Sequence, residues 1–149
     1  MSRRMSCPPY EGSACPDRIV ALEQAMRGEA GAIRFYTILA EMTPDQEQKN
    51  TIFRIRNDER RHLNNFQAVY CRLTGHTYAY PEPAVNVPPS YCAGLQMSFA
   101  DEQEAYEFYK LNYLCNSSPM VRNVFQDAML DEAEHARWFN NLLIRNDCD

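Results

Sequence analysis

Asp58-Glu59-Arg60-Arg61-His62 returns 73 positions later (132 − 59) as Asp131-Glu132-Ala133-Glu134-His135. At the same offset the stretch 29–36 falls on 102–109, and both stretches begin with glutamate and end with Phe-Tyr. The chain has only three histidines, and two of them stand in these matching Glu-x-x-His motifs. The repeat therefore predicts a duplicated architecture in which each half supplies one lone glutamate and one Glu-x-x-His pair.

Apolar residues around these motifs recur every three or four positions, which is the period of an α-helix. Asp17 can cap a first helix, and Thr43 followed by Pro44 can open a second. Gly75 is a plausible left-handed terminator of that second helix, and Ser117-Ser118-Pro119 repeats the opening signal. The predicted helices cover about 18–42, 43–75, 91–115 and 118–146.

Between the second and third helices lies a segment, about 76–90, whose four prolines forbid a continued helix. An extended chain of this length reaches roughly 45 Å at about 3.1 Å per residue, as far as a helix of about 30 residues. Helices two and three are therefore expected to run parallel. We predict an all-α four-helix bundle of two helical hairpins joined by a long crossover, with residues 1–16 as a mobile N-terminal arm and 17–149 as the domain.

Composition and charge exclude several classes of protein. The net charge of −5 comes from interspersed acids and bases, so no basic stripe is available for nucleic acid. No apolar run approaches the roughly 20 residues that cross a bilayer, and the first residues lack the apolar region of a signal peptide, so we expect no membrane partner and a cytoplasmic location. The six cysteines are expected to be reduced thiols in a domain with a large core, with disulfide or partner roles open for Cys7, Cys15 and Cys148 near the ends.

Each Glu-x-x-His pair projects from one face of its helix, because residues three apart lie on the same side. Apolar residues share these faces, and they also share the faces of Glu29 and Glu102, so all four carboxylates are predicted to converge in the core. Their desolvation costs several kcal/mol each unless something compensates it. Two divalent cations balance four carboxylates while both imidazoles stay neutral. Oxygen ligands with one imidazole per metal favour iron or manganese.

This pattern resembles the ferritin-like di-iron carboxylate superfamily, in which two helices each supply a glutamate and two others each supply Glu-x-x-His. The spacing from Glu29 to Tyr36 most resembles rubrerythrin and its relatives, and the resemblance covers about residues 18–146. It implies a ferritin-like bundle with two iron ions, or manganese as the alternative metal. By this match Glu59 and Glu132 are the bridging carboxylates. The implied metal ligands are Glu29, Glu59, His62, Glu102, Glu132 and His135.

Two features differ from rubrerythrin proper. Ala105 stands where rubrerythrin proper carries a further glutamate, three positions after Glu102, and a C-terminal rubredoxin domain is missing. The metal-switching peroxidase mechanism that uses the extra glutamate is therefore not expected here. The proline-rich crossover and the short tail also differ from a cage-forming ferritin.

The resemblance implies a di-iron oxidoreductase of the peroxidase or ferroxidase type, with a role in oxidative stress. Its partners would be hydrogen peroxide or dioxygen and an unidentified electron donor, and family analogy adds a homodimer. Tyr36 and Tyr109 are candidate catalytic residues, either as hydrogen-bond partners of a ligand or as electron sources. Two alternatives stay open, namely an iron-binding or storage protein and a metal-free structural bundle linked by its cysteines.

Overall fold

The computed structural model describes residues 14–149, which fold into four long helices. Most of the predicted N-terminal arm, residues 1–13, lies outside the described residues. Within the described range, no helix is both long enough and apolar enough to span a bilayer. The helices are α1 (Arg18–Ala40), α2 (Gln46–Thr74), α3 (Tyr91–Cys115) and α4 (Pro119–Arg145).

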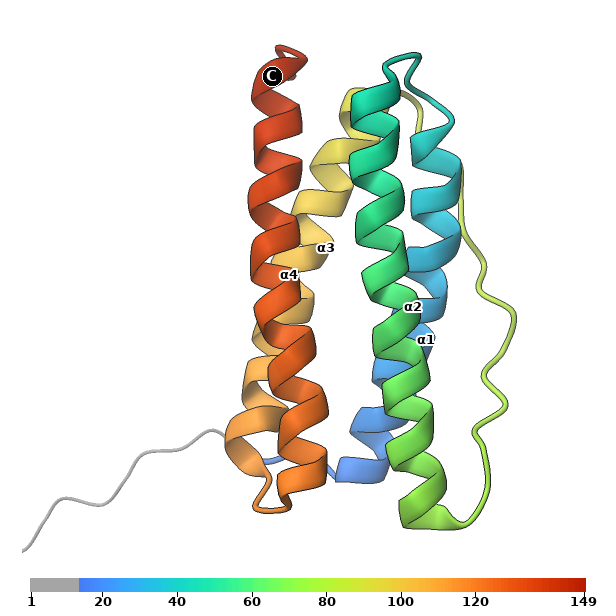
Figure 1. The fold of residues 1–149 in the computed structure, drawn as a ribbon, viewed down its shortest axis with the longest axis vertical. Coiled ribbons are helices and arrows are strands. Elements are labelled where there is room, and N and C mark those ends of the chain that lie inside the picture. Colours follow the sequence, from blue (N-terminus) through green and yellow to red (C-terminus); the bar gives the residue numbers. More distant parts are fainter. Residues whose placement is uncertain (1–13) are drawn as a thin grey trace, which may run out of the picture.

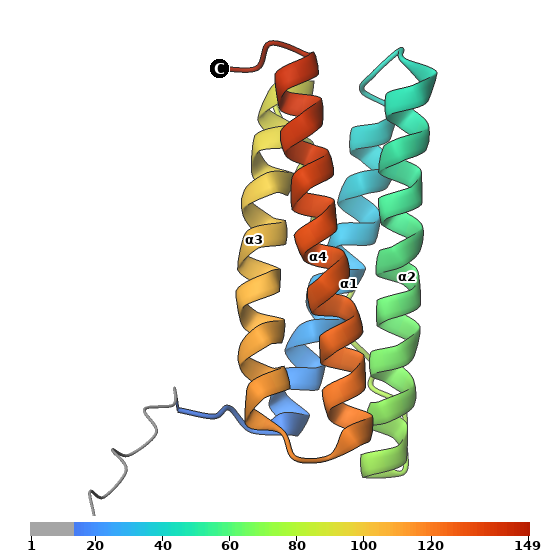
Figure 2. The ribbon, with the colours of Figure 1, turned by 60° about the vertical axis from the view of Figure 1, so that its left-hand side comes forward.

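The helices form two antiparallel hairpins, α1 with α2 and α3 with α4, as predicted (Figure 1). Figures 1 and 2 show the segment after α2 running back along the full length of the bundle, so that α3 starts at the same end as α2 and runs parallel to it. Two arginines of α1 hold this crossover. Arg27 donates to the Tyr78 hydroxyl at 2.9 Å, and Arg34 donates to the Glu82 carboxylate at 2.9 Å.

Most helix ends lie where the sequence predicted them. The Asp17 carboxylate accepts the N–H groups of Ile19 and Val20 at 3.0 Å each, and Gly75 ends α2 with a φ of 85°. The start of α2 was predicted two residues early. Asp45 caps it, because its carboxylate reaches the free N–H groups of the first turn, whereas the Thr43 hydroxyl only accepts the N–H of Asp45.

The core consists of two apolar clusters, one toward each end of the bundle. One is built around Phe66 and Phe125, and the other around Leu39 and Phe139, all of which are fully buried. On every helix the residues of one cluster precede the predicted ligand residues and those of the other follow them. The four buried glutamates therefore lie in the middle of the length of the bundle, between the two apolar clusters.

The prediction of reduced thiols was wrong for Cys92 and Cys115, and both bond to cysteines for which a disulfide had been left open. Cys15 is bonded to Cys115 and Cys92 to Cys148, with Cα–Cα distances of 5.5 Å in both pairs, while Cys71 is free. The bonds join both ends of α3 to segments near the chain ends, a pairing that spacing alone does not reveal. Because disulfides persist in oxidising environments, they count against a reducing cytoplasm. Cys7 lies outside the described residues.

Replacing Cys15 with serine should lower the free energy of unfolding by about 2–4 kcal/mol, because the lost bond closes a loop of 100 residues in the unfolded chain. Urea unfolding of the oxidised protein measures this change. Cys71→Ser is the matched control, since Cys71 has no disulfide partner, and its stability should stay near that of the wild type. Equal stability of the Cys15→Ser variant and the wild type would contradict the bond.

Candidate metal centre

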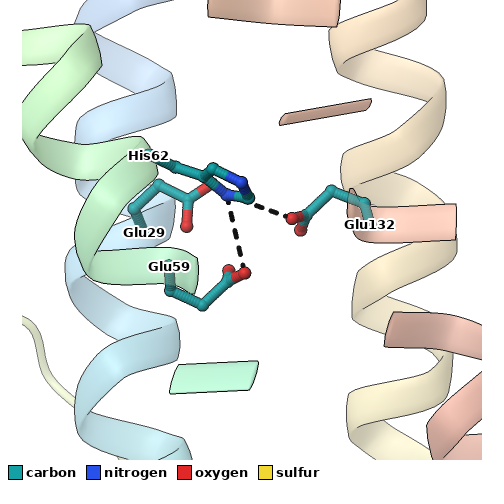
Figure 3. A group of neighbouring side chains, drawn as sticks. All are labelled: Glu29, Glu59, His62 and Glu132. Atoms are coloured by element: carbon teal, nitrogen blue, oxygen red, sulfur yellow. Dashed lines mark ion pairs between the residues drawn. The ribbon is translucent and has the colours of Figure 1, made fainter. Parts of the chain in front are cut away.

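All six predicted ligand residues meet at the middle of the bundle, and each is at most 2% exposed. Every helix contributes: α1 and α3 one glutamate each, α2 and α4 one Glu-x-x-His pair each. Figure 3 shows the His62 ring pointing between two carboxylates, Glu59 from its own side of the bundle and Glu132 from the opposite side. The helical faces predicted to be inward are therefore inward in the fold.

The six residues form two groups that share two members. The first contains Glu29 and His62, the second Glu102 and His135, and both contain Glu59 and Glu132. In each group the ligand atoms lie within 4.8 Å of one another. Two neighbouring groups with two common carboxylates form the geometry of a binuclear metal site.

The distances around each imidazole fit a shared ion. His62 Nδ1 lies 3.3 Å from Glu132 Oε1 and 3.6 Å from Glu59 Oε1, and His135 Nδ1 lies 3.1 Å from Glu59 Oε1. Two ligands about 2.1 Å from a common metal ion, at angles of 90–110°, are themselves roughly 3.0–3.4 Å apart. The donor atoms thus have nearly the spacing that a coordinated ion requires.

Several buried polar atoms of the site have no hydrogen-bond partner. Each of the six residues has one buried nitrogen or oxygen atom without a hydrogen-bond partner, and in both histidines that atom is Nδ1. Buried polar groups nearly always have a partner, so six orphaned atoms in one small volume require an explanation. A pair of cations would satisfy all of them.

The other nitrogen of each histidine is held by an aspartate from the opposite hairpin. His62 Nε2 lies 2.7 Å from Asp131 Oδ2, and His135 Nε2 lies 2.9 Å from Asp58 Oδ2. When Nε2 carries the ring proton and donates a hydrogen bond to the aspartate, Nδ1 is unprotonated. Its lone pair then points toward the four glutamate carboxylates. Both aspartates stand one residue before the motif glutamates and so belong to the repeat, but no role was predicted for them.

Arg61 connects the two aspartates. Its guanidinium lies 2.8 Å from Asp58, donates a hydrogen bond to Asp131, and lies 3.6 Å from Asp127. The repeat has no counterpart for it, because Glu134 stands at the corresponding position of the second motif. One cation on the α2–α4 face therefore holds both carboxylates that orient the two imidazoles.

The two candidate tyrosines contact the site. Each one bonds the glutamate on the other helix of the α1–α3 pair, and not the glutamate seven positions before it on its own helix. The Tyr36 hydroxyl on α1 donates to Glu102 on α3, and the Tyr109 hydroxyl on α3 donates to Glu29 on α1. Burial raises the pKa of both phenols, and the neighbouring carboxylates raise it further, so both remain protonated donors. These two hydrogen bonds cross between α1 and α3 and hold the carboxylates of Glu29 and Glu102 in place.

Burial and mutual repulsion control the protonation of the metal-free site. Desolvation raises the pKa of Glu59 and of Glu132 well above the usual value, and the other carboxylates add to the effect. Burial also lowers the pKa of both histidines, but the neighbouring carboxylates outweigh this effect. Asp131 and Glu29 raise the pKa of His62 to about 10, and Glu102 and Glu59 raise the pKa of His135 to about 11. Without metal, protons compensate the charge of the cluster.

Comparison with known proteins agrees with this geometry. The model of the rubrerythrin family matches residues 20–143. The chain belongs to the rubrerythrin family. This rubrerythrin-family chain is 37% identical over 124 residues to the protein YhjR of Bacillus subtilis (strain 168), a match that covers 83% of the chain and 85% of YhjR.

Solved structures share the fold of this rubrerythrin-family chain at low sequence identity. A hypothetical protein from Pyrococcus furiosus matches with a TM-score of 0.74 and 20% identity, covering 87% of this chain and 91% of the other. A two-domain protein from Anabaena variabilis, with DJ-1/ThiJ/PfpI-like and ferritin-like domains, matches with a TM-score of 0.71 and 17% identity, over 93% of this chain and 39% of the other. These likenesses confirm the predicted ferritin-like four-helix bundle.

Proposed function

We propose that the chain is a non-haem di-iron oxidoreductase that reacts with hydrogen peroxide or dioxygen. The observation that supports it most is the set of six orphaned buried atoms, one from each residue of the two clusters. Four carboxylates and two imidazoles are ligands that suit two divalent iron ions, with manganese as the alternative metal. Sulfur-rich sites, by contrast, select zinc or copper(I). The proposed ligands are Glu29, Glu59, His62, Glu102, Glu132 and His135.

When bound, a pair of ferrous ions supplies two electrons to an O–O bond. The protein holds the ligands in place for this reaction. Tyr36 and Tyr109 fix Glu102 and Glu29 by hydrogen bonds, which limits how far these carboxylates can swing. The apolar clusters on both sides exclude water from the two ends of the site, and this strengthens the electrostatic interactions within it.

A single-turnover experiment tests the proposal. Protein loaded anaerobically with two Fe(II) per chain is mixed with one equivalent of hydrogen peroxide, and ferric absorbance is followed by stopped flow. The expected result is oxidation of two Fe(II) per peroxide, much faster than the oxidation of free Fe(II) in the same buffer. The same mixing with dioxygen separates peroxidase from ferroxidase behaviour. Oxidation no faster than that of free Fe(II) with both oxidants would refute the function.

Arg61→Ala should weaken metal binding by about tenfold, because partners that orient a ligating histidine typically contribute 10–100-fold in affinity. The loss arises from freeing Asp58 and Asp131, which hold the imidazoles. Titration with Co(II), followed by its visible absorption, measures the affinity. Arg60→Ala is the matched control, since the Arg60 guanidinium is exposed and contacts Asn57 instead. Unchanged affinity in Arg61→Ala would show that the histidines keep their orientation without it.

A further inference from the structure

A cleft of about 520 Å³ opens between α1 and α3 and reaches the proposed metal centre. Its floor contains the four carboxylates of the centre, and residues 84–86 of the crossover form part of its wall. The other neighbouring helix pairs, α1–α2, α3–α4 and α2–α4, pack more closely than α1 and α3 do. The cleft is therefore a route from solvent to the carboxylates that runs between the two apolar clusters.

Small side chains create this space. Gly28, Gly31 and Ala32 of α1 line the cleft opposite Ala105 of α3. A Cβ atom added at Gly28 or Gly31 would have nothing within 4 Å, so the space in front of these residues is open. Larger side chains at these positions would fill the cleft without changing any of the residues in the two carboxylate clusters.

The cleft is much larger than hydrogen peroxide requires. A water molecule takes up about 30 Å³ in the liquid, so a molecule with two oxygens fills only a small part of 520 Å³. Pockets for small organic ligands occupy roughly 300–1,000 Å³ and combine apolar walls with a few polar groups. Here Phe35, Phe108, Met97 and Val85 supply apolar surface above the carboxylate floor.

We propose that the cleft admits a small, uncharged organic hydroperoxide, with its peroxide group at the carboxylate floor and its apolar body between Phe35 and Phe108. The proposal rests on the proposed function of the site. Asp101 and Glu104 lie exposed among the lining residues, while Arg27 is engaged by the Tyr78 hydroxyl. These acids disfavour an anionic substrate such as a fatty-acid hydroperoxide, which narrows the class to neutral molecules.

The reaction balances with the electrons that the proposed centre supplies. The O–O bond of the hydroperoxide breaks and takes up two electrons, one from each of two ferrous ions, together with two protons. The organic oxygen leaves as an alcohol and the other oxygen as water. The two ions end as ferric, so a single turnover needs no further reductant.

The first part of the test compares two oxidants in single-turnover stopped flow, hydrogen peroxide and cumene hydroperoxide. The wild type is expected to react with cumene hydroperoxide within tenfold of its rate with hydrogen peroxide. In Gly31→Leu the ratio of the cumene hydroperoxide rate to the hydrogen peroxide rate should fall at least tenfold. This helical substitution also favours folding, because leucine has the higher helix propensity. Ala100→Leu, on the exposed face of α3 outside the cleft, is the matched control and should keep the wild-type ratio.

The second part measures binding without turnover. The product-shaped alcohol 2-phenylpropan-2-ol is added to Zn(II)-loaded protein and its binding is followed by ligand-observed NMR, with weaker binding expected in Gly31→Leu than in Ala100→Leu. If the wild type reacts with hydrogen peroxide but not with cumene hydroperoxide, or if Gly31→Leu keeps the wild-type ratio, the inference fails while the proposed function stands. Reaction with neither oxidant refutes the proposed function instead. Lack of alcohol binding to the wild type also overturns the inference.

Discussion

Replacing Glu59 with glutamine is expected to abolish metal-linked stabilisation and, at the same time, to stabilise the metal-free protein. Glu59 belongs to both clusters, so its loss removes a ligand atom from both proposed metal positions. Two bound ions at a hundred times their dissociation constants contribute about 2.7 kcal/mol each to the free energy of unfolding, and the variant should lose this gain. In the metal-free protein, a neutral amide replaces a carboxylate whose pKa is raised by burial and by the neighbouring carboxylates. The folded state then no longer bears the cost of that buried acid, so its free energy of unfolding should rise.

Thermal unfolding of both proteins, with and without Fe(II) under anaerobic conditions, gives the two effects separately. Glu134→Gln is the matched control, because Glu134 stands in the second motif but is exposed and outside both clusters. It should behave like the wild type in both states. Metal-dependent stabilisation that survives in Glu59→Gln would exclude Glu59 as a shared ligand.

Metal binding at pH 7 is expected to release at least two protons, one from each imidazole, in addition to any held by the buried carboxylates. Burial lowers the pKa of His62 and His135, but their hydrogen bonds to carboxylates raise it to about 10 and about 11, so both rings are protonated in the metal-free protein. Binding through Nδ1 requires the neutral ring. The affinity should therefore rise with pH, on the order of a hundredfold per pH unit when both protons are displaced, between pH 6 and 8.

Calorimetric titration with Zn(II) in buffers of different ionisation enthalpy counts the released protons. The stability of the metal-free protein should change in the opposite direction to the affinity. A histidine pKa raised in the folded state stabilises fully below the unfolded value of about 6.5 and loses this effect as the pH rises through about 10–11. Binding without proton release at pH 7 would contradict the charged state of the metal-free site.

Helical periodicity and capping residues were sufficient to predict the helices, the proline-rich crossover to predict their connectivity, and the repeat to predict the six residues that meet in the core. This worked because a helix puts residues three and four apart on one face, and because apolar neighbours mark that face as inward. Glu132 and His135 follow Glu59 and His62 at the same offset of 73 positions. The two Glu-x-x-His pairs therefore lie at the same level along the bundle. These relations are local in sequence or follow from the repeat itself.

Features that depend on which helices face each other could not be predicted in the same way. The hydrogen bonds from Tyr36 and Tyr109 cross between α1 and α3, and the histidine-to-aspartate contacts cross between α2 and α4. Periodicity orients a residue on its own helix but does not identify its neighbour on another. The pairing of Cys15 with Cys115 likewise depends on where two chain segments end in space.

If the buried Glu/His clusters hold two metal ions, elemental analysis of purified, untagged protein after anaerobic loading with Fe(II) should detect both of them. About two iron atoms per chain are expected in the wild type and fewer in Glu59→Gln. Two manganese atoms in protein purified without added iron would keep the binuclear site and change the metal. Chains that stay metal-free after loading would show that the clusters bind no metal, and the four buried carboxylates would then need another explanation.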